Sequence, residues 1–202
     1  MKAGDKYKVP TGEQEGVILP NKLNLTDLHE LELAEAKGFI TAQILLRSGL
    51  NPTTKFDLKY ILNIHKIAFG DIYNFAGKPR TVDISKGGFR FPSAFHLDNT
   101  LKEFDRTILS EIRDLYENVS QLIEDIAKVH AELLFIHPFR EGNGRTARVL
   151  ANLMAEKAGY GRIPFERFDN EEMFGKYIEA VQRAAGGTYD PMQELIGLLF
   201  QP

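Results

Sequence analysis

The feature that most constrains this chain is a break between two apolar helical stretches. Residues 120–136 place Leu, Ile and Val at helical spacing, and His137-Pro138 follows at once. Proline cannot continue a helix and restricts the residue before it, so the first helix must end here. Helical spacing resumes at Arg145 and runs to about Ala158. The sequence therefore predicts two long helices joined by a short polar loop.

That loop and the turn after it, residues 137–148, carry side chains that suit phosphate chemistry. An ordinary imidazole titrates at about pH 6.5, so His137 is a candidate general base at neutral pH. Glu141 is the only acid in the loop, and magnesium commonly takes one carboxylate together with substrate phosphates and water. Taken singly, the histidine fits a packed core residue and the glutamate fits a solvated surface charge. The prediction of a phosphate site therefore depends on these residues occurring together in one short loop.

Gly142-Asn143-Gly144 and two arginines complete the pattern. Glycine permits positive φ and close backbone approach, so successive N–H groups can surround one anion beside a helix N-terminus. Arg145 and Arg148 are three residues apart, which predicts that they share a face and clamp phosphate together. A solvated helix face is the weaker interpretation, because cations near a helix N-terminus are unfavourable without an anion.

The remaining sequence predicts an all-α single domain over residues 1–202 with one small β-hairpin. Residues 1–24 lack periodicity and are expected to form an irregular N-terminal arm. Alternation on both sides of Lys86-Gly87-Gly88 predicts the hairpin, over residues 80–91. Because no βαβ pattern is present, the loose dinucleotide fingerprint at residues 142–147, which needs a preceding strand, is rejected. The predicted helices are residues 28–46, 54–69, 94–116, 120–136, 145–158, 170–185 and 191–200.

The composition is that of a globular protein without cysteine chemistry. The net charge is −3, which disfavours general nucleic-acid binding, and the absence of cysteine excludes disulfides and thiolate metal sites. No apolar run approaches the roughly 20 residues that span a bilayer, and residues 1–8 lack the apolar core of a signal peptide. We expect a cytoplasmic protein, with a secreted effector that carries another kind of signal as the alternative.

The stretch 137–148 resembles the HxFx(D/E)GNGRxxR signature of Fic-domain proteins at every fixed position, with Glu at 141. The residues Asn21–Asn24, Phe75–Lys78 and Ser85–Gly87 are also similar to stand-alone bacterial Fic proteins, and the likeness spans about residues 20–200. It implies a Fic-type helical bundle whose hairpin is a flap. It also implies an enzyme that transfers AMP from ATP to a Ser, Thr or Tyr hydroxyl of a target protein and releases pyrophosphate.

The resemblance assigns a role to each residue of the motif. It implies that His137 is the general base and that Glu141 holds Mg²⁺ between the α- and β-phosphates. Backbone amides of Gly142 to Gly144, with the Asn143 side chain, would stabilise the α-phosphate, and the two arginines would hold the β- and γ-phosphates. The target would dock on the flap by strand addition, for which a purely structural hairpin is the alternative. The implied nucleotide-binding set also includes Lys86, Gly87 and, near the adenine or else in the core, Tyr177.

Three questions stay open at this level. The signature does not separate AMP transfer from UMP, phosphocholine or phosphate transfer or from AMP removal, although the intact His137 argues against a non-catalytic binding module. Thr11–Gly16 matches the inhibitory string (S/T)xxxE(G/N) of many Fic proteins, but Gly12, Gly16 and Pro10 disfavour the helix it requires. We therefore expect a separate antitoxin-like partner to supply the glutamate, with inhibition by Glu15 as the alternative. The oligomeric state is not predicted.

Overall fold

The computed structural model describes residues 18–86 and 89–201, and over these residues it is all-α with one small hairpin, as predicted. Its helices are α1 Leu28–Ser48, α2 Leu58–Phe69, α3 Leu97–Thr107, α4 Val119–Ile136, α5 Asn143–Lys157, α6 Glu171–Ala184 and α7 Asp190–Leu199, and its strands are β1 Ser85–Lys86 and β2 Phe89–Arg90. In the described part of the predicted arm, residues 18–24 form neither helix nor strand. None of the helices described is both long and apolar enough to cross a membrane.

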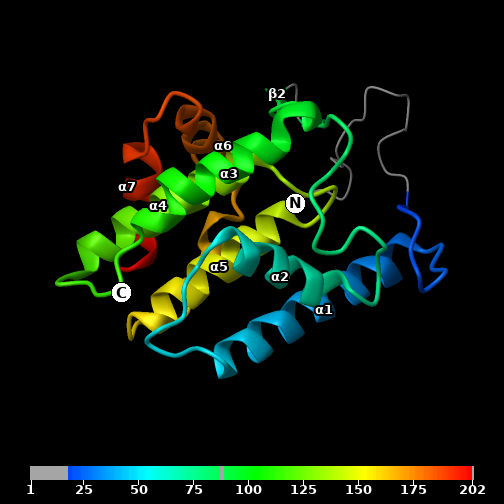
Figure 1. Cartoon of the computed structure of the whole chain (residues 1–202), viewed down its shortest axis with the longest axis horizontal. Coiled ribbons are helices and arrows are strands. Elements are labelled where there is room, and N and C mark those ends of the chain that lie inside the picture. The colour runs from blue at the N-terminus through cyan, green and yellow to red at the C-terminus, as the bar shows by residue number, and fades with distance from the viewer. Residues whose placement is uncertain (1–17, 87–88, 202) are drawn as a thin grey trace.

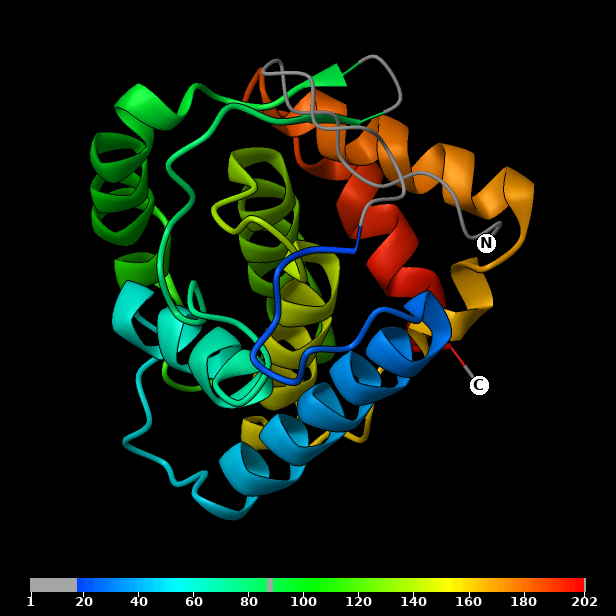
Figure 2. The same ribbon diagram turned by 90° about the vertical axis from the view of Figure 1, so that its right-hand side faces the viewer.

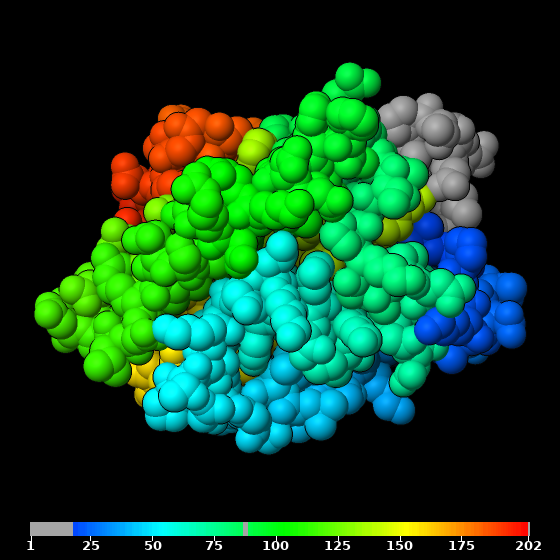
Figure 3. Space-filling model, viewed as in Figure 1, coloured from blue at the N-terminus to red at the C-terminus, as the bar shows by residue number. Residues whose placement is uncertain are grey.

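The fold is layered around α5. This helix packs against α1 and α2 on one side and against α4 on the other, and α4 in turn packs on α6 and α7 (Figures 1 and 2). In the space-filling view little of the yellow α5 shows between the green and cyan surfaces (Figure 3). Most side chains of α5 are buried. The helix that follows the motif is therefore the centre of the core, so the motif is anchored to the most buried part of the protein.

Polar side chains set where the helices begin. Asp57 accepts a hydrogen bond from the backbone N–H of Tyr60, which starts α2 at Leu58 and not at residue 54 as predicted. The same kind of N-cap precedes α1, which begins at the predicted residue, and α4 and α6, which begin within one residue of the prediction; these caps are Asp27, Asn118 and Asn170.

The predicted helix over residues 94–116 is wrong in its second half. The segment forms a 3₁₀ turn at Ala94–His96, then α3, then a second 3₁₀ turn at Leu109–Glu111. The helix α3 ends because Ile108 leaves the helical region, with φ −122° and ψ −55°. The chain after these turns is tied to α4: Arg113 donates its backbone N–H to Asp125 and its guanidinium to Asp125 and Glu124. These bonds replace the ones that a longer helix would have made.

The hairpin is shorter than the predicted 80–91. The two strands pair antiparallel, with Ser85 opposite Arg90 and Lys86 opposite Phe89, and one further bond joins the Phe91 N–H to the Ile84 carbonyl at 3.3 Å. Residues 80–83 do not pair with the second strand, since their hydrogen bonds go to the motif loop and to the chain after the hairpin. The prediction of a hairpin is thus confirmed and its length corrected.

Candidate functional site

His137 stands where α4 ends, in a left-handed backbone conformation with φ 53° and ψ 59°. Its backbone N–H donates to the Leu133 carbonyl, and its ring Nδ1 lies 2.8 Å from the Leu134 carbonyl oxygen. A carbonyl oxygen only accepts, so Nδ1 carries the proton and Nε2 carries the lone pair. The end of the helix therefore orients the imidazole and fixes its tautomer.

The hairpin covers this imidazole. The Phe91 ring stacks on the His137 ring with 3.9 Å between centroids, and only 6% of the histidine is exposed. Burial lowers the pKa of His137 to about 3, and the positive charges of Lys86 and Arg80 act in the same direction against the Leu134 hydrogen bond. The ring is consequently neutral near pH 7, which is the protonation state that a general base needs.

Asn143 closes the motif loop. Its side-chain oxygen accepts the Phe139 N–H at 2.8 Å, and its side-chain nitrogen donates to the Phe139 carbonyl at 2.7 Å. Both residues are almost wholly buried. The side chain was predicted to stabilise a phosphate, but the structure commits both its ends to the loop, because Phe139 would otherwise bury two unsatisfied backbone groups. Asn143 therefore holds the backbone of the motif loop in place through Phe139.

The backbone after Glu141 has the geometry expected of the predicted anion cradle. α5 begins at Asn143, two residues before the predicted start, and its first intrahelical bond runs from the Thr146 N–H to the Gly142 carbonyl. No side chain of a described residue caps this helix, so the N–H groups of residues 143, 144 and 145 face outward with the positive end of the helix dipole. The predicted nest of glycines is thus the first turn of α5 itself.

Gly142 cannot be replaced without strain. It is the N-cap of α5 with φ 78°, and a Cβ there would lie 2.7 Å from Phe69 Cε2 and 3.1 Å from Phe39 Cζ. A Cβ on Gly144 would meet nothing within 4 Å. The first glycine is needed by the fold, whereas the second leaves space at the outer surface of the cradle.

Glu141 lies at the mouth of the cradle. Its Oε1 accepts from the Gly142 N–H at 2.9 Å and lies 3.4 Å from the Arg145 guanidinium, while its side chain is 15% exposed. Its Oε2 makes no hydrogen bond within the described residues. A carboxylate with one oxygen left without a hydrogen bond, beside the first turn of α5, fits a magnesium ion that takes its other ligands from phosphates and water.

The two arginines diverge, contrary to the prediction of one shared face. Arg145 turns toward α1 and α2: it pairs with Glu35 at 2.7 Å and lies over the rings of Phe39 and Phe69. Glu35 is 2% exposed and also accepts from the Tyr73 hydroxyl. The charge of Arg145 is therefore already balanced by a buried carboxylate.

Arg148 turns to the opposite wall, where its guanidinium lies 5.8 Å from the centre of the Phe165 ring and its charge acts on the Tyr177 hydroxyl, against the burial that raises the pKa of that group. Its Nε is buried without a partner, and no carboxylate forms an ion pair with it among the described residues. Within the part of the chain that the structure describes, Arg148 is therefore the arginine of the motif that forms no ion pair.

Tyr177 belongs to the core and does not line the site. It is 5% exposed, and its hydroxyl donates to His130 Nε2 at 2.6 Å. The His130 Nδ1 lies 3.3 Å from the Ala147 carbonyl. Burial lowers the pKa of His130 to about 3, helped by the charge of Arg148, so the ring is neutral and accepts from the tyrosine. Of the two readings of Tyr177, adenine contact and core residue, the structure supports the second, with the added role of holding Arg148.

His65 is a site residue that the sequence reasoning missed. Its Nδ1 accepts the Gly77 N–H at 2.8 Å, its Nε2 donates to the Glu141 carbonyl at 3.0 Å, and its ring stacks on Phe139 at 3.8 Å. Burial lowers its pKa to about 4. The only signal in the sequence was a histidine on the apolar face of a helix, which does not reveal a partner 76 residues away.

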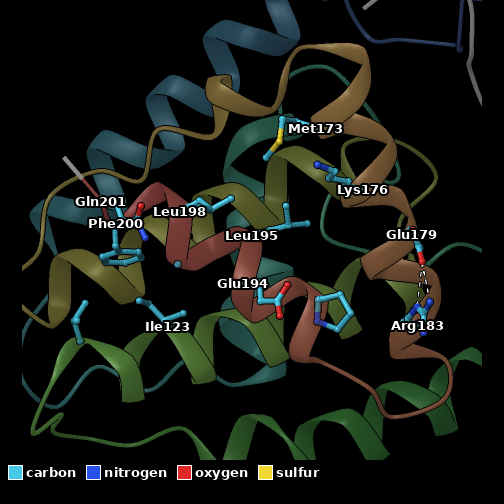
Figure 4. A pocket seen from close by; sticks show the side chains of 13 residues that line it. Ile123, Met173, Lys176, Glu179, Arg183, Glu194, Leu195, Leu198, Phe200 and Gln201 are labelled. Atoms are coloured by element: carbon cyan, nitrogen blue, oxygen red, sulfur yellow. Dashed lines mark hydrogen bonds and ion pairs between the residues drawn. The ribbon is translucent and has the colours of Figure 1, made fainter.

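The other predicted site residues are only partly described. Lys86 lies on β1, close enough for its charge to act on His137, whereas Gly87 and the Thr11–Gly16 string lie outside the described residues. A separate open groove of about 1010 Å³ lies between the start of α4 and the helices α6 and α7 (Figure 4). No motif residue lines it.

Comparisons with known proteins agree with this geometry. Residues 55–155, half of the chain, match the family model described as the Fic/DOC family. The protein adenylyltransferase VbhT of Bartonella schoenbuchensis is 32% identical over 188 residues, which cover 93% of this chain and 38% of VbhT. The probable protein adenylyltransferase y4lH of Sinorhizobium fredii is 28% identical over 183 residues, covering 87% of each.

A solved structure shares the fold of this chain. The crystal structure of BepC, a VirB-translocated effector of Bartonella tribocorum with bound AMPPNP, has a TM-score of 0.71 at 23% identity and covers 93% of this chain and 94% of BepC. The chain spans about two fifths of the length of VbhT. With the signature, the helical bundle and the family match in agreement, the chain belongs to the Fic/DOC family.

Proposed function

We propose that this protein transfers AMP from ATP to a Ser, Thr or Tyr hydroxyl of a target protein. The observation that carries the proposal is the pairing of a neutral, oriented His137 with the uncapped N-terminus of α5 across one short loop. VbhT and y4lH are named as adenylyltransferases, and the BepC structure contains an ATP analogue, which supports the same donor here.

The chemistry follows from the two ends of the loop. The target hydroxyl oxygen bonds to the α-phosphorus of ATP, the bond from that phosphorus to the bridging oxygen breaks, and pyrophosphate leaves. His137 Nε2 takes the hydroxyl proton. The triphosphate beside the ring favours imidazolium, which raises the pKa of His137 from its low value in the nucleotide-free protein and makes it a stronger base.

The phosphates have distinct partners in this arrangement. The N–H groups of residues 143–145 face the α-phosphate, where charge builds up during transfer. Arg148, which forms no ion pair with a described residue, binds the terminal phosphates, and Arg145 supports the cradle through Glu35 and Glu141. Mg²⁺ held by Glu141 would neutralise phosphate charge when bound.

The target segment docks on the hairpin in this proposal. Because Phe91 N–H bonds to the Ile84 carbonyl, the next pair, Ser85 and Arg90, is the non-hydrogen-bonded kind, whose backbone groups point away from the hairpin. These outward groups can pair with an added strand, whose side chain then comes near the His137 ring below.

Restraint would come from a separate protein with a carboxylate that pairs with Arg148 and so competes with the terminal phosphates. Among the described residues no carboxylate pairs with Arg148, which leaves it open to such a partner; inhibition by Glu15, which lies outside those residues, is the alternative. We place the reaction in a compartment that supplies ATP and Mg²⁺, the cytoplasm of the producing cell or of a cell that receives the protein.

The proposal is tested by His137→Ala with ATP labelled at the α-phosphate. Transfer of label to protein should fall by roughly 10² to 10⁴-fold, the usual contribution of a general base. ATP affinity measured by calorimetry should stay nearly constant, because the imidazole acts on the acceptor. His29→Ala, which removes an exposed histidine of α1, is the matched control.

Full transfer by His137→Ala would disprove the assignment of the base. Label that moves only from the γ-phosphate, or only from UTP in a parallel panel, would replace AMP transfer with phosphate or UMP transfer.

A further inference from the structure

Arg80 is a buried arginine outside the motif, 4% exposed, whose side chain bonds only to backbone carbonyls. Its Nε donates to the His137 carbonyl at 2.8 Å, and its Nη1 donates to the Val82 carbonyl at 2.8 Å. Its Nη2 lies 2.5 Å from the Pro92 carbonyl and 3.5 Å from that of Ile136. A guanidinium with this many partners is held in one orientation.

The acceptors belong to two parts of the protein. Val82 and Pro92 flank the hairpin on its two sides, whereas Ile136 and His137 are the last turn of α4 and the entrance to the motif loop. The Arg80 backbone adds a bond from its N–H to the Pro138 carbonyl at 2.7 Å. One side chain therefore closes the base of the hairpin and joins it to the catalytic histidine.

The chemistry of these bonds requires arginine. The carbonyls at the end of α4 carry the negative end of the helix dipole, which favours a cation there. Only a planar guanidinium presents several donors in a fixed fork, whereas a lysine ammonium reaches one or two of the carbonyls from a flexible stem. Burial lowers the pKa of Arg80, but not enough to remove the charge from a group of this basicity.

A second clasp closes the hairpin base from the outside. Asp83 accepts from the Ser93 hydroxyl at 3.0 Å and from the Ala94 N–H at 2.7 Å. The bonds of Arg80 and Asp83 fix Pro92 and the two residues after it, and Phe91, which precedes Pro92, lies over the His137 ring. The position of the hairpin relative to the imidazole thus depends on Arg80 more than on the two short strands.

We propose that Arg80 is a positioning residue that joins the hairpin and His137 into one unit, so that a segment paired to the hairpin presents its hydroxyl to His137 Nε2. The functional part of this inference rests on the proposed AMP transfer. The structural part does not, because the link between hairpin and histidine exists without nucleotide or target.

The test compares Arg80→Lys with Arg113→Lys. Arg113 is a matched control because it also holds a loop to α4 through backbone and carboxylate bonds, at the other end of that helix. Amide hydrogen exchange is measured over residues 82–92 and over the helices in the nucleotide-free protein. Self-modification from labelled ATP and calorimetric ATP affinity are measured in parallel.

For Arg80→Lys we expect exchange in residues 82–92 to rise about tenfold or more while the helices α1, α2 and α5 keep their protection. Modification should fall about tenfold with ATP affinity changed less than about threefold, since positioning affects the acceptor. Arg113→Lys should change none of these at the hairpin.

Three results would overturn the proposal: unchanged exchange in the hairpin, exchange that rises equally in every helix, or a loss of ATP affinity as large as the loss of transfer. If hairpin exchange rises but the wild-type protein transfers no AMP, the link stands and the proposed function fails. The experiment therefore distinguishes a failure of the Arg80 link from a failure of the proposed AMP transfer.

Discussion

At the residue scale, the two glycines of the motif show how one residue type serves two purposes. Gly142 adopts φ 78° against the rings of Phe69 and Phe39, where a Cβ has no room. Gly144 lies in the first turn of α5 with open space where its Cβ would stand. Steric demand fixes the first position, whereas the second is open for approach by a ligand.

This difference predicts opposite effects of the same substitution. Gly142→Ala should lower the free energy of unfolding by about 2–4 kcal/mol, because it combines positive φ with overpacking. Gly144→Ala should leave that energy unchanged or raise it by up to about 1 kcal/mol, because alanine is the better helix former. Gly144→Ala should instead weaken ATP binding, since the added methyl group occupies the mouth of the cradle.

Urea unfolding of both variants measures the first effect and calorimetry the second. A destabilised Gly144→Ala, or a stable Gly142→Ala, would contradict the described backbone. ATP affinity unchanged in Gly144→Ala would move the phosphate away from the first turn of α5.

At the element scale, the hairpin is a short element that leads directly into Phe91, whose ring stacks on His137. Its strands are two residues each, far too few to be stable alone. Phe91 on the His137 ring, buried Ile84 and the clasp of Arg80 tie it to the body of the protein. An element with so little pairing of its own can offer both outer edges to a partner strand.

The edge used by a target can be identified with proline. Ser85→Pro removes an outward N–H from β1, and Arg90→Pro removes one from β2, while the bonds between the strands remain. We expect one of the two variants to lose about tenfold or more of its target modification and the other to keep most of it. ATP affinity should stay within about threefold in both, as judged by calorimetry.

Ser85→Ala and Arg90→Ala separate the loss of a backbone donor from the loss of a side chain. Full modification by both proline variants would rule out strand addition and favour a purely structural hairpin. Equal loss of modification and ATP binding would mean that the prolines disturb the phosphate site itself.

At the scale of the whole molecule, three neutral histidines lie in the packed layers. His65 joins α2 to the motif loop, His130 joins α4 to α6, and His137 ends α4. Burial is the main cause that lowers the pKa of each, to about 4 for His65 and about 3 for the other two. In the unfolded chain each would titrate at about 6.5.

This shift makes stability depend on pH in a defined window. Below about pH 6.5 the unfolded chain binds protons that the folded protein does not, so stability is complete above that pH and falls as the pH decreases toward 4. Each histidine contributes up to roughly 1.4 kcal/mol per pH unit in this range. Burial raises the pKa of Glu132, so this one group changes stability with pH in the opposite direction to the three histidines.

Denaturant unfolding at about pH 7.5, 6.5 and 5.5 measures the effect. The carboxylates with lowered pKa, such as Asp83 and Glu166, lose their stabilising charge only at lower pH, so the window reports on the histidines. Equal stability at the three pH values would mean that the histidines are not buried as described.

Local sequence alone determined much of this protein. The His137-Pro138 break, the helical spacing on either side and the glycines of the motif led to the correct fold class and to the right family. These features are set by neighbours a few residues away, through proline geometry, apolar periodicity and turn preferences, which is why they can be read without a structure.

What only the tertiary structure decided is the use of each polar side chain. Glu35 neutralises Arg145 from 110 residues away, Arg80 reaches carbonyls 57 residues along the chain, and Tyr177 pairs with His130 across two helices. Asn143 turns back to Phe139 because that backbone is buried and must be satisfied. Such partners meet only after the layers pack, so the types of residue in the sequence could not predict which arginine of the motif pairs with a carboxylate.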